Sequence, residues 1–329
     1  MDVRWGIAGT GGIAARFAEA IALTDGHLAA VGSRSQEHAN AFGDRFGIVR
    51  RHSSYDALAD DDQVDVVYVA TPHSRHESDA VLFLEAGRHV LCEKPLALNQ
   101  AQASRMVAVA QARNRFLMEG IWSRFLPAYR VLGELLAEDR IGPVRFVEGS
   151  FGFAMPFGAS HRLFDRSLGG GALLDVGLYP LQLCSLVLGA PDRVVADGHV
   201  GTSGVDEQVV AVLHHPEGRL GVVQAAIRTN LRNDARIVGE SGTIELPAFM
   251  HSPDHLVLST IEGREQIPGH WEGDGLRFQI DHVHECLSAG RTQSPILPLD
   301  ESIRLAATMD AIRSDLGVVY PGEAEHPSS

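Results

Sequence analysis

One lysine stands out among the residues that could do chemistry. Lys94 is the only lysine in a chain with 28 lysine and arginine residues, and it lies in Cys92-Glu93-Lys94-Pro95, directly after an apolar run. Arginine supplies a permanent charge but cannot lose a proton, whereas a lysine ammonium is compact and has a readily shifted pKa. This exception to the arginine bias indicates a chemical role for Lys94. A satisfied charge at the end of a strand is the alternative.

Asp175 and Tyr179 form a second candidate pair. They lie four residues apart at the start of an apolar segment, 171–188, that predicts a helix, so both side chains are expected on one helical face. Gly177 between them is expected to keep that face thin enough for a ligand to approach. Taken separately, Asp175 could instead interact with the helix dipole, and Tyr179 could be half-buried packing.

A glycine-rich loop near the N-terminus predicts a nucleotide site. Gly9-Thr10-Gly11-Gly12-Ile13-Ala14 fits the pattern G-x-G-x-x-A and stands between a predicted strand and a predicted helix. That order lets the backbone turn sharply and places a pyrophosphate on the helix N-terminus. The residues expected to hold the dinucleotide here are Gly9, Gly11, Gly12 and Ile13. A purely structural turn is the alternative.

The end of the second predicted strand, Gly32-Ser33-Arg34-Ser35, indicates which dinucleotide binds. NAD-selective sites usually place an acid there to accept from the ribose 2′-hydroxyl, and this chain has none. Ser33 and Arg34 offer a hydroxyl and a guanidinium, which suit a 2′-phosphate. We therefore expect NADP, while NAD use stays open, as does a merely solvated Arg34.

A third strand end, Thr71-Pro72-His73-Ser74-Arg75-His76, is expected to line the same cofactor cleft. Thr71, Pro72, His73 and His76 are predicted to face nicotinamide or ribose. His73 and His76 could suggest a metal pair, but no third ligand stands at a recognisable spacing. We therefore expect no metal.

The elements that must position these residues fall into two groups. Up to residue 121, apolar runs alternate with helical periodicity, which predicts an α/β fold: a Rossmann domain with a doubly wound parallel sheet. Residues 122–329 predict a substrate-binding and oligomerisation domain of α+β type with a mostly antiparallel open sheet. Its last helix, 299–315, is expected to pack back on the Rossmann domain. The predicted strands are 4–9, 28–33, 64–70, 89–93, 116–119, 144–153, 193–200, 208–214, 219–229, 235–238, 243–246 and 256–261. Turns at 216–218 and 240–242 are expected to use glycine at positive φ.

Composition limits the classes of function. The formal charge of −14 argues against nucleic-acid or anionic-membrane partners, because phosphate groups demand clustered cations. No run approaches the roughly 18 continuous apolar residues typical of a membrane span, and the first residues enter a strand without room for a signal peptide. The three cysteines are odd in number and widely spaced, which favours buried thiols in a reducing compartment. We expect a cytoplasmic protein.

The motifs together resemble the Gfo/Idh/MocA oxidoreductase family across essentially the whole chain. The resemblance rests on the glycine loop, Thr71-Pro72 with His76, Glu93-Lys94-Pro95, and Gly171 to Tyr179. A closer similarity, to the dimeric dihydrodiol dehydrogenase and NADP-dependent D-xylose dehydrogenase branch, rests on 4–7, 91–95, 118–125 and 169–175. Many family members have histidine where this chain has Tyr179.

The resemblance implies an NADP-dependent dehydrogenase of a sugar or a vicinal diol. Tyr179 would take the hydroxyl proton, Lys94 would polarise the same oxygen and lower the phenol's pKa from its usual value of about 10, and Asp175 would orient a neighbouring hydroxyl. Glu93 is grouped with the cofactor-binding residues. The expected walls of the substrate pocket are Trp122, Arg124 and Phe153, with His161 and Arg162 reaching a sugar hydroxyl; for Trp122, aromatic packing at a domain junction is an equal alternative.

The resemblance also implies a homodimer or homotetramer formed through the C-terminal sheet. Two other functions remain in view at this stage. One is a regulatory protein that senses NADP without turnover, and the other is a glycoside-processing enzyme whose nicotinamide cycles without net redox change. The sequence does not decide the substrate, the direction of the reaction or the number of subunits.

Overall fold

The computed structural model describes residues 3–323, which form two compact units. The first contains the chain up to residue 97 together with 101–125 and 272–303, and the second contains 98–100, 126–271 and the chain from 304 onward. The contacts thus add a C-terminal segment, 272–303, to the N-terminal unit, and the helix predicted at 299–315 begins in one unit and continues in the other. The predicted boundary between residues 121 and 122 stays a prediction.

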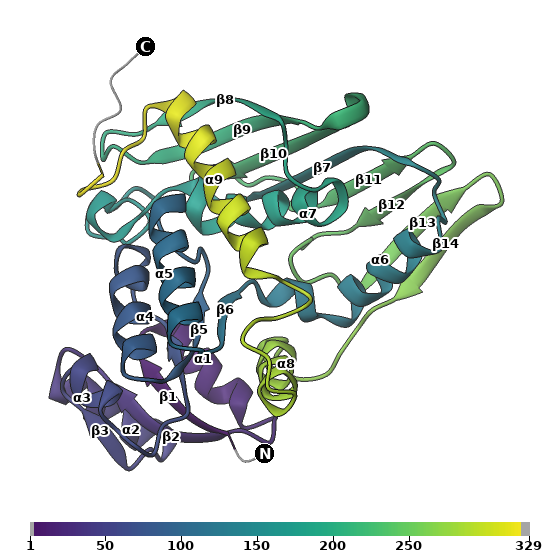
Figure 1. The fold of residues 1–329 in the computed structure, drawn as a ribbon. Helices are drawn as coiled ribbons and strands as arrows, with labels where there is room; N and C mark the ends of the chain where they lie inside the picture. Colours follow the sequence, from purple (N-terminus) through teal and green to yellow (C-terminus); the bar gives the residue numbers. More distant parts are fainter. Residues whose placement is uncertain (1–2, 324–329) are drawn as a thin grey trace. The chain divides into compact units, whose positions relative to one another are not determined.

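The first unit is built on a six-stranded parallel sheet in the order β3-β2-β1-β4-β5-β6 (Figure 1). This order, with β1 in the middle and the chain moving outward in both directions, confirms the doubly wound Rossmann fold. Its strands are β1 (Arg4–Ala8), β2 (His27–Gly32), β3 (Arg50–His52), β4 (Val66–Val69), β5 (His89–Glu93) and β6 (Leu117–Gly120). Its helices are α1 (Gly12–Ile21), α2 (Gln36–Phe46), α3 (Tyr55–Ala59), α4 (His76–Glu85), α5 (Gln100–Ala112) and α8 (Leu276–Ser288).

Burial explains why the sequence predicted some of these elements and missed others. Every residue of β4 is buried, so the strand is a continuous apolar run that is easily recognised. The edge strand β3 consists of two arginines and a histidine, and α3 has only five residues. Neither contains enough apolar periodicity to be predicted, and both were missed.

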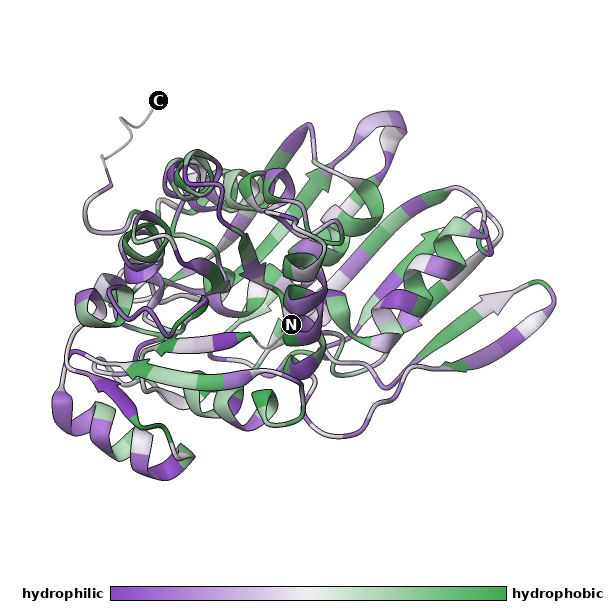
Figure 2. Ribbon diagram, turned by 60° about the horizontal axis from the view of Figure 1, so that its bottom comes forward, coloured by the Kyte–Doolittle hydropathy of each residue, from purple (hydrophilic) through white to green (hydrophobic). Residues whose placement is uncertain are grey.

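The second unit contains an eight-stranded sheet in the order β14-β13-β12-β11-β7-β10-β9-β8. All neighbouring strands are antiparallel except β7 and β10, which confirms the mostly antiparallel sheet. Figure 2 shows hydrophobic and hydrophilic residues alternating along strands of this sheet. The strands are β7 (Val144–Gly152), β8 (Arg193–Val200), β9 (Asp206–His214), β10 (Leu220–Ala226), β11 (Ala235–Gly239), β12 (Gly242–Leu246), β13 (His255–Thr260) and β14 (Gly263–Pro268). The helices are α6 (Pro127–Ala137), α7 (Leu178–Leu188) and α9 (Leu299–Leu316).

Two details of this sheet differ from expectation. Strand β14 was not predicted, because its sequence, GREQIP, is polar and largely exposed. Gly218 adopts the expected positive φ of 71°, but Gly242 is absent from the glycines with positive φ. An added Cβ at Gly242 would lie 2.6 Å from the carbonyl oxygen of Ser259 on the neighbouring strand. Close approach of β13, rather than turn conformation, therefore explains this glycine.

The helix that carries Asp175 and Tyr179 begins differently from the prediction. Leu173–Gly177 forms one turn of π-helix, and the regular helix α7 follows from Leu178. A single π turn inside a longer helix is rare and is frequently found at functional sites. Gly177 was expected to let a ligand approach the helix. In the structure, a Cβ added at Gly177 would lie 3.1 Å from Ala225 Cβ of β10. The glycine therefore lets the helix pack closely on the sheet.

The segment Arg166–Leu188 is long and apolar enough to cross a membrane by length and composition alone. The criterion of continuous apolar residues did not identify this segment, because polar residues interrupt it. Of the apolar window in this segment, 83% is buried inside the protein, which is the behaviour of a core helix.

Candidate active site

The glycine loop at the start of α1 has the geometry of an anion-binding site. Gly9, at φ 110°, packs against the next strand, since an added Cβ would lie 2.8 Å from Ala70 O. Gly11 and Gly12 are exposed, and a Cβ added at either would meet no atom within 4 Å. The helix has no side-chain cap and no acid in its first turn. Its first N–H groups are therefore free of an internal anion, and the residues present fit the pyrophosphate of a dinucleotide.

The end of β2 lies next to β3, the strand that the sequence analysis missed. Ser33 is buried and its Oγ accepts from the Ser35 N–H at 3.4 Å, while Arg34 is exposed. Within residues 3–323 no carboxylate forms an ion pair with Arg34. Burial and Asp79 raise the pKa of the Tyr55 phenol, and the charges of Arg34 and Arg75 partly offset that rise, so positive charge gathers at this strand end.

The 71–76 segment forms a single 3₁₀ turn, His73–Arg75, that leads into α4. His76 is fully buried, and its ring nitrogens lie 2.7 Å from Pro95 O and 2.9 Å from Thr71 O. The buried imidazole thus connects the loop that follows β4 with the loop that follows β5. Its ring lies 5.6 Å from that of His73, edge to face. The prediction that this segment faces the nicotinamide stays a prediction.

Lys94 directly follows β5, and its backbone N–H lies next to the buried carboxylate of Glu93. The Tyr68 hydroxyl donates a short hydrogen bond to Glu93 Oε1, and the Lys94 backbone N–H donates to Glu93 Oε2 at 3.3 Å. Phe17 of α1 stacks on Tyr68 with ring centroids 3.8 Å apart. Burial raises the pKa of Glu93, and the charge of Lys94 acts in the opposite direction. Glu93, grouped above with the cofactor-binding residues, is thus fixed next to Lys94 from inside the sheet.

A second buried acid near Lys94 was missed from the sequence. Glu119 of β6 is 1% exposed, and its Oε1 accepts from the Leu96 N–H at 2.8 Å. Burial raises the pKa of this carboxyl to about 7. The available signal was an acid at the end of the otherwise apolar run Phe116–Met118.

Trp122 and Arg124, the expected pocket walls, both have structural partners in the first unit. The guanidinium of Arg16 lies 4.7 Å from the centre of the Trp122 ring and binds Asp274 through Nε at 2.6 Å. Arg124 is 4% exposed and forms a close ion pair with Glu301. Burying a charge requires such a partner.

In the second unit, the structure brings three predicted residues to one place. Arg162 Nη1 donates to Asp175 Oδ1 at 3.0 Å, and Asp175 is 5% exposed. The guanidinium of Arg162 is thus directed at the carboxylate of Asp175, and the prediction that Arg162 reaches a substrate hydroxyl stays a prediction. Tyr179 lies one turn further along, with its ring 5.5 Å from Phe151 and 5.1 Å from His251.

His251 was not predicted. It stacks on Phe151 with ring centroids 4.5 Å apart and 12° between planes, next to Tyr179. It lies between β12 and β13, in a loop that carried no pattern pointing to the site. Phe153, half-buried, directly follows β7. His161 is exposed, and its Nδ1 accepts from the Leu163 N–H at 3.3 Å.

A buried carboxylate supports the start of this helix. Asp206 is 0% exposed and its Oδ2 accepts from the Leu173 N–H at 2.6 Å, at the first residue of the π turn. The Tyr320 hydroxyl donates to Gly170 O at 2.5 Å. Gly171, at φ 121°, has no room for a Cβ, which would collide with Asp206 Oδ1. Burial raises the pKa of Asp206 to about 7, and the bond from Leu173 only partly offsets this.

The predicted residues thus form two groups, one in each unit. The glycine loop, Arg34, the 71–76 segment and Lys94 belong to the first, while Arg162, Asp175 and Tyr179 belong to the second. Across the part of the chain that the structure describes, no group of three or more histidine, cysteine, aspartate or glutamate side chains could hold a metal ion.

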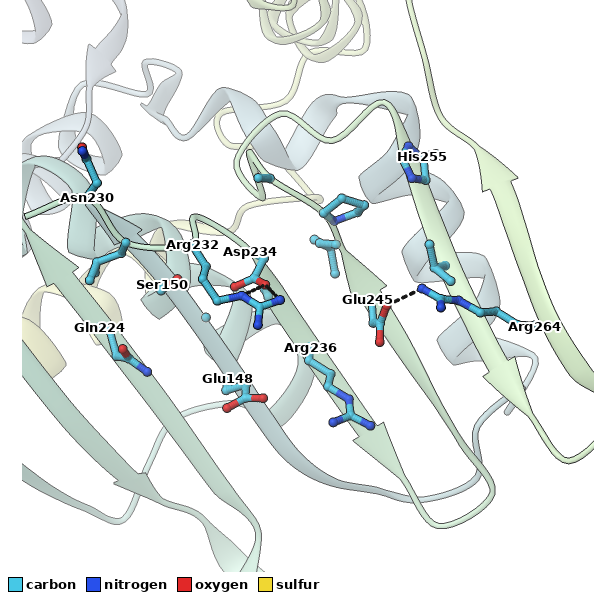
Figure 3. A pocket seen from close by; sticks show the side chains of 17 residues that line it. Glu148, Ser150, Gln224, Asn230, Arg232, Asp234, Arg236, Glu245, His255 and Arg264 are labelled. Carbon is cyan, nitrogen blue, oxygen red and sulfur yellow. Dashed lines mark hydrogen bonds and ion pairs between the residues drawn. The ribbon is translucent and has the colours of Figure 1, made fainter. Parts of the chain in front are cut away.

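A large hollow of about 980 Å³ lies on a face of the eight-stranded sheet, and none of the predicted site residues lines it (Figure 3). Charged side chains line it, with Arg232 paired to Asp234 and Arg264 paired to Glu245. Arg236 lies in register between Glu148 of β7 and Glu245 of β12.

Comparison with known proteins covers both units. Residues 3–121 match the oxidoreductase family with an NAD-binding Rossmann fold, and residues 129–245 match the GFO/IDH/MocA C-terminal domain. Trans-1,2-dihydrobenzene-1,2-diol dehydrogenase from Xenopus laevis is 36% identical over 332 residues, which cover 98% of this chain and 100% of the relative. The Homo sapiens enzyme of the same name is 34% identical, covering 98% of this chain and 99% of the relative.

Solved structures agree with the fold. The aldose-aldose oxidoreductase from Caulobacter crescentus, complexed with glycerol, superimposes with a TM-score of 0.87 at 27% identity, covering 96% of this chain and 97% of that one. KijD10, a 3-ketoreductase from Actinomadura kijaniata, in complex with NADP and TDP-benzene, gives 0.83 at 29% identity, covering 96% and 98%. The matched family has an NAD-binding Rossmann fold, and the ketoreductase was crystallised with NADP; both agree with a nicotinamide dinucleotide at the open helix end of Gly11 and Gly12. Both halves of the chain and its full-length relatives agree, and the chain belongs to the Gfo/Idh/MocA family of oxidoreductases.

Proposed function

We propose that this protein is an NADP-dependent dehydrogenase that acts on a carbinol of a sugar or a vicinal diol. The observation that carries the proposal is the match over 98% of the chain to relatives named as dehydrogenases of a diol. Its structural neighbours are a 3-ketoreductase with NADP and an aldose-aldose oxidoreductase. All act on alcohol or carbonyl carbons, so the class of CH–OH donor is common to them.

The chain's own residues divide the work of a proton transfer. Tyr179 accepts the hydroxyl proton of the carbinol, and Lys94 donates a hydrogen bond to the same oxygen and favours the phenolate. Asp175, held by Arg162 at 3.0 Å, accepts from a neighbouring substrate hydroxyl. NADP, when bound, supplies the hydride acceptor or donor.

Structures of the 3-ketoreductase support the choice of residue types. One carries a tyrosine replaced by phenylalanine and others carry a lysine replaced by alanine or glutamate, all crystallised with NADP and TDP-benzene. The replaced lysine precedes the replaced tyrosine by almost the same distance along the chain as Lys94 precedes Tyr179. A lysine and a tyrosine were thus the residues chosen for substitution in that protein.

The kinetic test compares the two residues with a matched control. NADP⁺ reduction is followed by NADPH absorbance with D-xylose, D-glucose, other aldoses, inositols and trans-dihydrodiols. Tyr179→Phe should lower kcat/KM by at least about 100-fold, the usual scale of general acid–base catalysis, with NADPH affinity unchanged. Lys94→Met should do the same, while Arg113→Met, at an exposed arginine, should retain full activity.

Either of two results would defeat this proposal. Wild-type kcat/KM in Tyr179→Phe across the pH range would remove the general-base role. Tight NADPH binding without turnover on any substrate of the panel would favour the sensing protein, or the redox-neutral glycoside enzyme if product then formed without net NADPH.

Cofactor choice forms a separate part of the proposal, resting on Ser33 and Arg34. Arg34 is exposed at the strand end, where its charge can bind a 2′-phosphate, and no acid stands there to accept from a 2′-hydroxyl. Arg34→Ala should weaken NADP⁺ binding about tenfold or more, the scale of one charge-assisted hydrogen bond, and leave NAD⁺ binding nearly unchanged. Equal losses for both dinucleotides would contradict the assignment.

We also propose that the hollowed face of the eight-stranded sheet pairs with a second copy of the chain. Arg236 is exposed between two glutamates in register, Glu148 and Glu245, so the face carries both signs of charge. A two-fold contact places the same patch on both subunits and can match arginines with carboxylates. Light scattering should show a dimer or tetramer that Arg236→Glu dissociates and Arg113→Glu does not; a monomeric wild type would end this proposal.

The state of the thiols supports a proposal for the compartment. Cys92, Cys184 and Cys286 are all free and buried. Proteins of reducing compartments keep cysteines in this state, so we propose a cytoplasmic location, which cell fractionation tests directly.

A further inference from the structure

A second cavity lies in the first unit, at the amino edge of the parallel sheet. It has a volume of about 400 Å³. The glycine loop follows the carboxyl end of β1, whereas the cavity begins before the same strand, at Val3. The five residues of β1 separate the two places by roughly 17 Å at 3.3 Å per residue. The lining residues are Val3, Val64, Asp65, Gly87, Arg88, His89, Asn114, Arg115, Leu287, Gly290, Arg291 and Thr292.

The charges around this arginine cavity are unbalanced. Arg88, Arg115 and Arg291 line it, and among residues 3–323 no carboxylate forms an ion pair with any of the three. Asp65 is the only acid in the lining. Its two carboxylate oxygens already accept from Arg4, at 2.9 Å from Nε and 2.7 Å from Nη2. The cavity therefore concentrates positive charge in a protein whose net charge is −14.

Of the three guanidinium groups, that of Arg88 is held in place by the protein backbone before any ligand arrives. Arg88 donates from Nε to Ala59 O and from Nη1 to Val64 O, both at 3.0 Å. Arg115 lies over Gly87, where an added Cβ would be 3.7 Å from Nη2. Its Nε is buried and makes no hydrogen bond within the described chain. A buried N–H group without an acceptor is unusual in a folded protein and leaves a donor that a ligand oxygen can accept from.

His89, which also lines the cavity, lies within the influence of Arg115. His89 Nδ1 accepts from the Phe116 N–H at 2.9 Å. Burial and then the charge of Arg115 lower the pKa of His89 to about 4, although Asp65 acts against this. The charge of Arg115 thus acts on His89 against that of Asp65, in the same direction as burial.

We propose that the arginine cavity binds a small anion through its phosphate group. Guanidinium groups bind phosphate oxygens through paired N–H donors, and a divalent phosphate balances more of the three positive charges than a single carboxylate. A cavity of this size lies within the roughly 300–1,000 Å³ of small-molecule sites, so it can hold more than a bare phosphate. The site is independent of the proposed dehydrogenase activity and lies at the opposite edge of the sheet from the cofactor.

The test uses the full chain saturated with NADPH, so that the pyrophosphate site is filled. Titration calorimetry with inorganic phosphate, and separately with glycerol 3-phosphate, is done at fixed ionic strength. One site per chain should appear, weakened at least tenfold in Arg115→Gln and in Arg291→Gln. Arg113→Gln, an exposed arginine outside the cavity, should bind as wild type does.

The possible results distinguish an organic phosphate from the free ion, and both from the absence of a site. Tighter binding of glycerol 3-phosphate identifies an organic phosphate, and tighter binding of inorganic phosphate identifies the free ion. Absence of binding at millimolar concentrations, or equal binding in all three variants, overturns the proposal. Arg291 is exposed, so its variant tests the site even where Arg115→Gln fails to fold.

Discussion

Two helices in this molecule begin in opposite ways: one leaves its first N–H groups open, and the other binds one of them with a buried side chain. The first turn of any helix presents N–H groups without partners and a partial positive charge. At α1 the chain leaves these groups open, with Gly11 and Gly12 exposed and no acid in the first turn. At the helix carrying Asp175 and Tyr179, the buried carboxylate of Asp206 binds the Leu173 N–H.

The difference indicates which helix end is open to a ligand and which is fixed by a side chain of the protein itself. An open end lined by glycines takes an external anion, so it suits the pyrophosphate of NADP. An end closed by a buried carboxyl group of the protein gives up that capacity and gains a fixed starting point. From that point the π turn sets Asp175, and α7 then sets Tyr179.

The largest expected effect comes from closing the open end. Gly12→Asp would place a carboxylate in the first turn of α1, close to the pyrophosphate. Repulsion on the order of 3 kcal/mol, reasonable for charges near a protein surface, corresponds to about 100-fold weaker NADPH binding. The free energy of unfolding should stay equal or rise slightly, because an acid favours a helix N-terminus. Fluorescence titration measures the NADPH affinity, and urea unfolding measures the free energy of unfolding. An unchanged NADPH affinity would contradict the interpretation of the α1 N-terminus as an open anion site.

The reverse experiment disturbs the closed end. Gly171→Ala would force a Cβ into Asp206 Oδ1 at a φ of 121°, which side chains rarely adopt. Unfolding should become easier by about 3 kcal/mol, measured in urea, because strain at such a position and a displaced cap act together. NADPH affinity of the folded protein should not change. A cofactor defect with normal stability would contradict the separation of roles.

The carboxyl group of Asp206 should also affect how the free energy of unfolding depends on pH. The pKa of Asp206 is raised to about 7 in the folded chain, above its usual value near 3.8. The folded protein thus holds a proton that the unfolded chain releases, and this group's contribution to stability falls as pH rises from about 4 to 7. Asp206→Asn removes that slope. The variant should gain about 2 to 3 kcal/mol relative to wild type between pH 5 and pH 8, seen in paired urea titrations, and a flat difference would disprove the buried-carboxylate account.

The smallest effect is expected where a helix start is closed by an exposed, uncharged group. Ser54 Oγ accepts from the Ala57 N–H at 3.1 Å at the start of α3. Ser54→Ala should cost about 1 kcal/mol in the free energy of unfolding, the usual value for a lost cap, and should not affect NADPH binding. A cost as large as that of Gly171→Ala would mean that capping alone, without burial, explains the closed end.

Much of the first unit was predictable because its signals are local. Continuous apolar strands such as β4, the glycine loop and the order of strand and helix are all written in neighbouring residues. The contacts that hold the start of the Asp175 helix were not predictable, because they join residues that are distant along the chain. Asp206 lies 33 positions from Leu173, and Tyr320 lies 150 from Gly170. Glycines were the least predictable: Gly177 and Gly242 look like ligand or turn positions but serve close packing.

The sequence by itself determined the doubly wound sheet, the mostly antiparallel second sheet and the dinucleotide loop, and it marked Lys94, Asp175 and Tyr179 as chemical candidates. These depend on periodicity and on motifs, which act over a few residues. Only the tertiary structure decided that Arg162 holds Asp175, that His251 stacks beside Tyr179, that buried Asp206 closes a helix end, and that three arginines meet at the far edge of the Rossmann sheet. Such contacts arise when folding brings distant residues into a low-dielectric interior, where burial and unmatched charge acquire their cost.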